Sequence, residues 1–356
     1  MEAKETIALK NGQMLTPFQR IEEGAILIEN GVIKAVGEAH DVRIPSDARI
    51  ISIEGRTLIP GFIDINSHSG GGDEALYDKY EAVNELTKLN AENGITGFLL
   101  TTVAAPQETL LKTVKAAKAA IERGTEGAEV LGIHLEGPYI NVEKRGGHNE
   151  KYVRKPSLEE VDELIEASGN NVKMITLAPE LEGGIEFIKD ICQRGIVASV
   201  GHSNATYEQM ISAVKAGLNH ACHTYNGMRD FNHREPGILG AVLTIDEITN
   251  EIIADGAHVH PAAVKMLVKC KDLDKIILVA AGSGLMMNVA VRNIMDFCGL
   301  SLQDAVRMAT VNPAKRIGVS DRKGSLEVGK DADIAIVDDN LDVHMTIIKG
   351  RKVFER

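Results

Sequence analysis

The sequence predicts an α/β protein, a (β/α)8 TIM-like barrel joined to a small β-sandwich domain built from both termini. Apolar strand candidates alternate with helical patterns through the middle of the chain, which is typical of a parallel sheet covered by helices. Both ends instead consist of short strands and tight turns, and neither end has enough apolar residues to form a core alone. At 356 residues the chain is long enough for one large and one small domain.

The N-terminal part reads as strands. Residues 25–28 and 32–36 are apolar stretches separated by Glu29-Asn30-Gly31, and Asn-Gly favours a tight β-hairpin turn. We therefore expect a hairpin here.

The C-terminal part has the same character, with strand candidates at 333–337 and 345–348. We expect residues 1–58 and 322–356 to pair into the small β domain, and residues 59–321 to form the barrel.

Eight buried strand candidates form the repeat of the predicted barrel. In the clearest helix between them, apolar residues recur at three- and four-residue spacing before Gly124, a helix stop signal. Eight repeats favour a closed barrel over an open doubly wound sheet, whose dinucleotide fingerprint is absent. The strand candidates lie near residues 59–65, 97–104, 130–137, 172–179, 196–203, 219–225, 250–257 and 275–281.

Three of these strands end in side chains that bind metals, namely Glu136, His202 and His223. Barrel active sites lie at the carboxyl ends of the strands, so we expect these three side chains to meet. One Glu and two His are a ligand set of catalytic zinc sites, which keep a position open for water. Three buried residues satisfied by hydrogen bonds are the alternative, but an unpaired buried carboxylate is costly. We therefore favour a metal.

Composition excludes several classes of protein. The net charge of -12 argues against nucleic acid as a partner. No apolar run reaches the roughly 20 residues needed to span a bilayer, and no signal peptide is visible. We therefore expect a cytoplasmic protein. Four separated cysteines indicate neither a disulfide framework nor a zinc knuckle, and strand alternation predicts that Cys222 points away from the face of His223.

Several strings together resemble the N-acetylglucosamine-6-phosphate deacetylases of the amidohydrolase superfamily, over nearly the whole chain. Residues 324–333, through which the chain re-enters the small domain, also resemble this superfamily. The strings are Pro60-Gly61-Phe62-Ile63-Asp64, His134-Leu135-Glu136-Gly137-Pro138, Gly201-His202-Ser203-Asn204-Ala205-Thr206, His223-Thr224-Tyr225-Asn226-Gly227-Met228, Arg234-Glu235-Pro236-Gly237, Asp255-Gly256-Ala257-His258-Val259-His260 and Asn312-Pro313-Ala314.

The resemblance implies a role for each matching position. Glu136, His202 and His223 match the metal ligands, and His148 matches the histidine that polarises the acetyl carbonyl. The resemblance also implies a homodimer, in which Arg234 is supplied to each active site by the neighbouring subunit. The substrate-binding positions are Asn226 and Gly227, near the phosphate and hydroxyls, and Arg234 and His258, the phosphate contacts.

This chain departs from the superfamily pattern after the first barrel strand. Two-metal members carry His-x-His there, whereas this chain has Asn66-Ser67-His68. The loss of one imidazole favours a single divalent ion, with His68 left to contact the substrate or to bind a second ion weakly. Zinc is the first candidate for this ion, and iron, manganese and cobalt also suit Glu and two His.

A larger departure lies at the eighth strand, where the family has a catalytic aspartate in a Thr-Asp-Ala string. No Asp occurs between Asp274 and Asp296. Either the protein lacks this residue, or a segment is missing from the sequence at about Val279/Ala280. We favour a missing segment, because the other active-site positions are intact.

The resemblance implies a deacetylase that converts N-acetylglucosamine 6-phosphate and water into glucosamine 6-phosphate and acetate. Two alternatives remain open: an amidohydrolase acting on a different N-acyl sugar or a cyclic amide, and a degenerate sugar-phosphate binder without catalysis.

Overall fold

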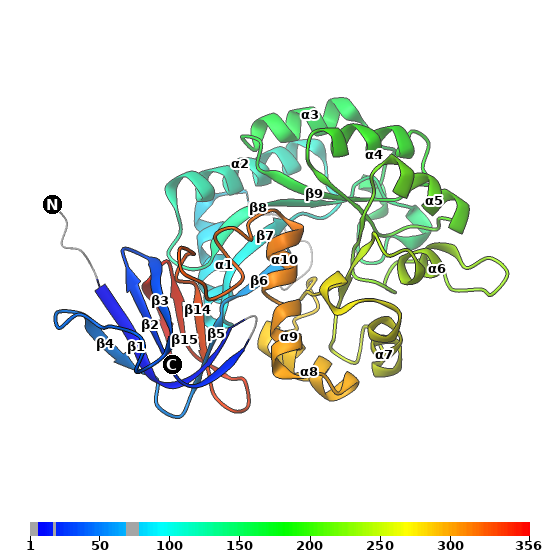
Figure 1. Cartoon of the computed structure of the whole chain (residues 1–356). Coiled ribbons are helices and arrows are strands. Elements are labelled where there is room, and N and C mark those ends of the chain that lie inside the picture. The colour runs from blue at the N-terminus through cyan, green and yellow to red at the C-terminus, as the bar shows by residue number, and fades with distance from the viewer. Residues whose placement is uncertain (1–5, 17–18, 69–77) are drawn as a thin grey trace.

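A computed structural model describes residues 6–16, 19–68 and 78–356, which form a barrel and a smaller β domain (Figure 1). The barrel sheet is parallel throughout, with its strands in sequence order. Its end strands meet at the rim, where the backbone N–H of Ala281 donates to the carbonyl of Asn66 over 2.9 Å. The strands are β6 (Phe62–Ser67), β7 (Ile95–Thr101), β8 (Glu129–Glu136), β9 (Val172–Leu177), β10 (Val197–Val200), β11 (His220–Ala221), β12 (Thr249–Ile252) and β13 (Ile276–Leu278).

Helices follow the strands and cover the outside of the barrel (Figure 1). As predicted, Gly124 ends a helix, with φ of 78°. The α-helices are α1 (Tyr80–Glu92), α2 (Gln107–Arg123), α3 (Leu158–Ala167), α4 (Gly184–Gln193), α5 (Tyr207–Ala216), α6 (Gly237–Thr244), α7 (Pro261–Cys270), α8 (Met287–Cys298), α9 (Leu302–Met308) and α10 (Val311–Arg316). Short 3-10 helices occupy Val142–Lys144, Glu150–Tyr152 and Leu273–Lys275. No helix among the described residues is both long and apolar enough to cross a membrane.

The small β domain is built from both ends of the chain, as predicted. In Figure 1 the blue N-terminal strands and the red C-terminal strands lie side by side. One sheet runs β16-β15-β14-β5-β1-β2-β3, and β4 pairs with β1. The strands are β1 (Thr6–Leu15), β2 (Arg20–Glu29), β3 (Val32–Glu38), β4 (Arg49–Ser52), β5 (Thr57–Pro60), β14 (Ile334–Val337), β15 (Val343–Ile348) and β16 (Arg351–Glu355).

The predicted hairpin is confirmed, because β2 pairs antiparallel with β3 through a turn at Asn30 and Gly31. Both turn residues have positive φ, 50° and 79°, as this turn requires.

The chain passes from the small domain to the barrel at Gly61, between β5 and β6. A β-carbon at Gly61 would lie 2.1 Å from Cγ2 of Thr96, so only glycine fits. The strand predicted at 59–65 is therefore two strands, because β5 pairs with β14 in the terminal sheet. The division of the chain between residues 58 and 59 stays a prediction.

The barrel interior has an apolar floor and a polar layer above it. Apolar residues from the strands, with Ala314 and Ile317 from the region of α10, form one cluster that fills the floor. The buried polar side chains Glu136, His202 and His223 stand at or just beyond the carboxyl ends of β8, β10 and β11. The fold thus places the predicted ligands at one end of the barrel.

Candidate metal centre

The carboxylate of Glu136 lies among four imidazoles. Its Oε1 is 3.0 Å from Nε2 of His202, 3.1 Å from Nε2 of His148 and 3.4 Å from Nε2 of His223. The Nε2 atoms of His202 and His223 are 3.0 Å apart. The other carboxylate oxygen of Glu136, Oε2, is 3.3 Å from Nε2 of His68. The three predicted ligands and His148 are therefore brought together, although they come from distant parts of the sequence.

Two of the imidazoles depend on unusual backbone conformations. His202 follows β10 with φ of 49°, and His223 follows β11 with φ of 22°. Such conformations are uncommon for residues other than glycine, and they cluster at functional sites. Here they end the strands and turn both side chains toward Glu136.

Hydrogen bonds at Nδ1 determine how His202 and His223 present Nε2. Nδ1 of His202 donates to the carbonyl of Lys144 over 2.8 Å, and Nδ1 of His223 donates to the carbonyl of Asn226 over 3.1 Å. A carbonyl only accepts, so the proton is on Nδ1 and the neutral ring keeps a lone pair on Nε2. This is the arrangement of a metal-bound histidine, whose other nitrogen donates to a carbonyl.

His148 has the opposite tautomer. The backbone N–H of Ala104 donates to Nδ1 of His148 over 3.0 Å, so the proton of the neutral ring is on Nε2. That N–H donates to Oε1 of Glu136. His148 is therefore suited to donate a hydrogen bond and not to ligate an ion, which separates its role from those of His202 and His223.

The electrostatics of the cluster fit a cation. Burial lowers the pKa of His202 and so disfavours its imidazolium form. At His223 burial also opposes protonation, but hydrogen bonding to Glu136 outweighs it and raises the pKa of His223. Burial opposes ionisation of Glu136, but the surrounding imidazoles, His148 first, hold the pKa of Glu136 well below its usual range. The carboxylate of Glu136 facing the lone pair of the neutral His202 ring is repulsive unless a positive charge lies between them, and a divalent ion supplies that charge. The residues present therefore fit a divalent metal.

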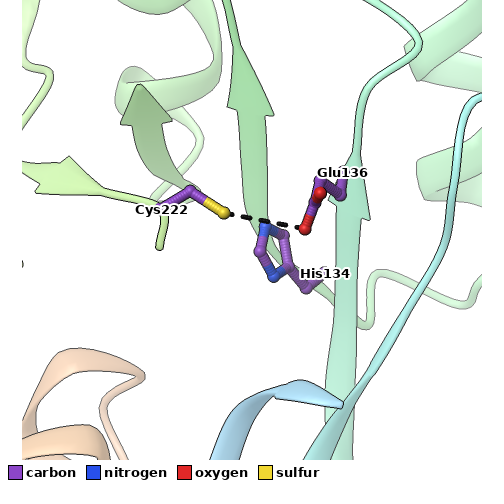
Figure 2. A group of neighbouring side chains, drawn as sticks. All are labelled: His134, Glu136 and Cys222. Carbon is purple, nitrogen blue, oxygen red and sulfur yellow. Dashed lines mark hydrogen bonds between the residues drawn. The ribbon is translucent and has the colours of Figure 1, made fainter. Parts of the chain in front are cut away.

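The other oxygen of Glu136 faces Cys222, and Figure 2 shows this contact beside His134. Oε2 is 3.6 Å from Sγ of Cys222, so the prediction that Cys222 points away from the site is wrong. β11 ends at Ala221, and the turn of the backbone at His223 breaks strand alternation.

His134 has no free ring nitrogen with which to bind a metal beside Glu136 and Cys222. Its Nδ1 donates to the carbonyl of Ile65 over 3.0 Å, and its Nε2 bonds Oγ1 of Thr176 over 2.7 Å. Burial lowers the pKa of His134 to about 4, so the ring is neutral. It is a satisfied structural histidine.

The sequence reasoning missed Glu251. This carboxylate is fully buried on β12, with Oε1 2.9 Å from Nε2 of His220 and Oε2 2.9 Å from Nδ2 of Asn66. Burial opposes ionisation, but hydrogen bonding to His220 outweighs it and lowers the pKa of Glu251 to about 2. The available signal was a carboxylate directly before the apolar run Ile252-Ile253-Ala254, within a predicted barrel strand.

Asn66 is held as a hydrogen-bond donor. Its Nδ2 donates to Glu251 and, over 3.2 Å, to Sγ of Cys222. Its Oδ1 is buried and has no hydrogen-bond partner among the described residues.

Two predicted substrate residues border the cluster. Asn226 Nδ2 is buried and has no hydrogen-bond partner, which leaves a donor for a ligand. Gly227 has φ of 62°, and a β-carbon there would lie 2.8 Å from Nδ1 of His202. Glycine is therefore required next to this imidazole.

The two predicted phosphate contacts lie apart from the cluster. Arg234 is exposed on the loop before α6, and no contact within the described residues joins it to the imidazoles. His258 is also exposed, and its Nδ1 lies 2.5 Å from Oδ2 of Asp255. The structure brings neither residue to Glu136.

The eighth strand offers no carboxylate. β13 ends at Leu278, and residues 279–286, which connect it to α8, contain neither Asp nor Glu. Ala281, in this connection, packs against the apolar cluster of the barrel interior.

Comparison with known proteins places these observations in a family. The model of the amidohydrolase family matches residues 57–353. N-acetylglucosamine-6-phosphate deacetylase of Bacillus subtilis is 32% identical, covering 98% of this chain and 98% of that protein. N-acetylgalactosamine-6-phosphate deacetylase of Escherichia coli O157:H7 is also 32% identical, covering 97% of this chain and 99% of that protein.

A solved structure agrees over almost the whole chain. It is an aspartate-to-alanine variant of N-acetyl-D-glucosamine-6-phosphate deacetylase from Mycobacterium smegmatis in complex with N-acetyl-D-glucosamine-6-phosphate. It superposes with a TM-score of 0.87 at 28% identity, covering 98% of this chain and 99% of that chain.

The barrel, the ligand cluster and these matches define a metal-dependent hydrolase, and the chain belongs to the amidohydrolase family. Within that family, the resemblance to the N-acetylglucosamine-6-phosphate deacetylases is confirmed. The alignment with the Bacillus protein spans 387 positions, more than the 356 residues of this chain, and the Bacillus protein therefore has residues that this chain lacks.

Proposed function

We propose that this protein is a metal-dependent deacetylase that hydrolyses N-acetylglucosamine 6-phosphate to glucosamine 6-phosphate and acetate, in amino-sugar catabolism. The convergence of Glu136 Oε1 with Nε2 of His202 and His223, at separations of 3.0 to 3.4 Å, carries the proposal. Ligands about 2.0 Å from a tetrahedral zinc ion lie roughly 3.3 Å from one another. The cluster thus has the dimensions of a zinc site.

The proposed ligands are Glu136, His202 and His223, with one ion per subunit. A divalent ion at this position would lower the pKa of its water to about 7 and polarise the acetyl carbonyl. Zinc is the proposed metal, and iron, manganese and cobalt suit the same ligands.

His148 is the proposed catalytic hydrogen-bond donor. Its Nε2–H faces the cluster because Ala104 holds its Nδ1 as an acceptor. The same N–H would donate to the acetyl oxygen as negative charge develops there, a contribution typically of about 10²–10³ in kcat.

The remaining proposed contacts recognise the sugar phosphate. Asn226 and Gly227 border the cluster, and the free donor of Asn226 supports a substrate contact. Arg234 and His258 are the proposed phosphate contacts. Arg234 is exposed and so accessible to another subunit, and the proposed assembly is a homodimer in which Arg234 reaches the neighbouring active site. Because charged sugar phosphates do not cross membranes freely, we infer a cytoplasmic enzyme.

Proton transfer is the weak step for this chain. No carboxylate stands at the end of β13, and Glu136 is engaged as a proposed ligand. General acid–base catalysis is typically worth about 10²–10⁴ in rate. We therefore expect the 356-residue chain to be slower by this factor than a relative that has the strand-eight aspartate.

A second substrate is favoured by one comparison. The Escherichia coli O157:H7 relative, named for N-acetylgalactosamine 6-phosphate, is as similar in sequence as the Bacillus protein. The two sugars differ only in one hydroxyl configuration, which the contacts above do not distinguish.

The test is acetate release by zinc-loaded protein from each of the two sugar phosphates. We expect release from N-acetylglucosamine 6-phosphate, lost in Glu136→Gln. Faster release from the galactosamine substrate would identify the second candidate. Substrate binding without any acetate release would identify a degenerate binder and overturn the proposal.

A further inference from the structure

His223 stands on the least supported strand of the barrel. β11 contains only His220 and Ala221, and it pairs with each neighbour through those two residues. His223 lies beyond the strand, with φ of 22° and a buried position. Its backbone conformation must therefore be fixed by contacts other than the sheet.

Glu251 supplies those contacts. Its Oε2 accepts from the backbone N–H of His223 over 3.1 Å, and its main-chain carbonyl accepts from the N–H of Thr224 over 2.8 Å. One residue of β12 thus holds both amides at the turn. Without the carboxylate, the N–H of His223 would be buried with no hydrogen-bond acceptor, which is unfavourable.

The carboxylate of Glu251 is itself fixed from two other strands. Asn66 of β6 donates to Oε2 and His220 of β11 donates to Oε1, each over 2.9 Å. Glu251 is fully buried, so water does not compete for these bonds. The side chain thus joins β6, β11 and β12 through hydrogen bonds.

We propose that Glu251 is a positioning residue that holds His223 in the conformation needed for metal binding. The inference rests on the proposed function, because it takes His223 as a ligand. Glu251 is not one of the proposed ligands. It would act through the backbone of His223, which carries the imidazole whose Nε2 lies 3.0 Å from Nε2 of His202. Removal of a residue that hydrogen-bonds a metal ligand typically weakens metal binding about 10–100-fold.

A role in hydrogen bonding can be distinguished from a role as a buried negative charge. In Glu251→Gln the amide oxygen still accepts from His223 and Asn66. The amide NH2 can donate to Nε2 of His220 if that ring moves its proton to Nδ1, which lies 2.7 Å from Oγ1 of Thr249. The glutamine variant therefore keeps the geometry and removes the charge, whereas Glu251→Leu removes both.

The experiment measures the zinc dissociation constant of each variant by competition with a chelator, and the visible spectrum of the cobalt-substituted protein. We expect Glu251→Gln to match the wild type. We expect Glu251→Leu to bind zinc about 10–100-fold more weakly and to show an altered cobalt spectrum. Thr249→Val is the matched control, because it removes the other partner of His220 without touching a proposed ligand, and it should bind zinc normally.

Two results would overturn the inference: wild-type affinity in Glu251→Leu, or a loss in Glu251→Gln of tenfold or more. The second result is informative even if the leucine variant does not fold. In the wild-type zinc protein, the amides of His223 and Thr224 should exchange slowly with deuterium, and rapid exchange would also contradict the inference. Absence of zinc binding in the wild type would instead overturn the proposed function.

Discussion

Replacing Asp64 with asparagine should stabilise the metal-free protein increasingly as the pH rises. Asp64 is fully buried on β6, where its Oδ1 accepts from the backbone N–H of Asn66 over 3.0 Å and its Oδ2 has no hydrogen-bond partner. Burial, assisted by the charge of Glu251, raises the pKa of Asp64 from 3.8 to about 7. Asparagine keeps the acceptor and has no charge to bury.

The size of the effect follows from this shift. The folded protein holds the proton more tightly than the unfolded chain, so the favourable contribution is full below pH 3.8. It is lost as the pH rises through about 7. The shift of about three pKa units corresponds to about 4 kcal/mol in total, of which roughly 2–3 kcal/mol falls between pH 5 and pH 8.

The assay is urea unfolding of both proteins at pH 5 and pH 8 in the presence of a chelator. The free energy of unfolding of the variant minus that of the wild type should increase by roughly 2–3 kcal/mol between the two conditions. Added zinc should reduce this increase, because a nearby cation favours the ionised carboxylate. A difference that is independent of pH would refute the reasoning.

Three further predictions concern the reaction. Ala281→Asp places a carboxylate three residues beyond β13, beside the interior cluster, and should raise kcat by up to about 10²–10⁴. An unchanged kcat in the metal-loaded variant would contradict this. His148→Phe should lower kcat about 10²–10³-fold while the protein keeps its metal, and loss of the metal would show that His148 is a ligand instead. Replacing both Arg234 and His258 with alanine should raise KM for N-acetylglucosamine 6-phosphate and leave KM for unphosphorylated N-acetylglucosamine unchanged. An equal effect on both substrates would exclude phosphate recognition by these residues.

The sequence was sufficient for the architecture because the relevant patterns are local. Asn30-Gly31 specifies a hairpin turn by its backbone preferences, and Gly124 ends a helix at a positive φ. The alternation of strands and helices predicts a barrel because each strand must be covered. The separation of β5 from β6 at Gly61 was not predicted, since the apolar run gives no sign that its two halves join different sheets.

The polar layer could be predicted only in part. Glu136, His202 and His223 are recognisable because each comes at the end of a predicted barrel strand. Cys222 was misplaced because period-two alternation fails where a strand of two residues gives way to a left-handed turn. The tautomers of the histidines depend on the carbonyls and amides of distant loops, such as Lys144 for His202, and no pattern in the sequence contains them.

The most direct test of the account is the metal content of the protein, measured by elemental analysis after purification without chelators. The account predicts one divalent ion per chain, retained by His148→Phe and lost in Glu136→Gln and in His202→Ala. An ion-free wild-type protein that also fails to take up added zinc would contradict it, as would full metal content in Glu136→Gln.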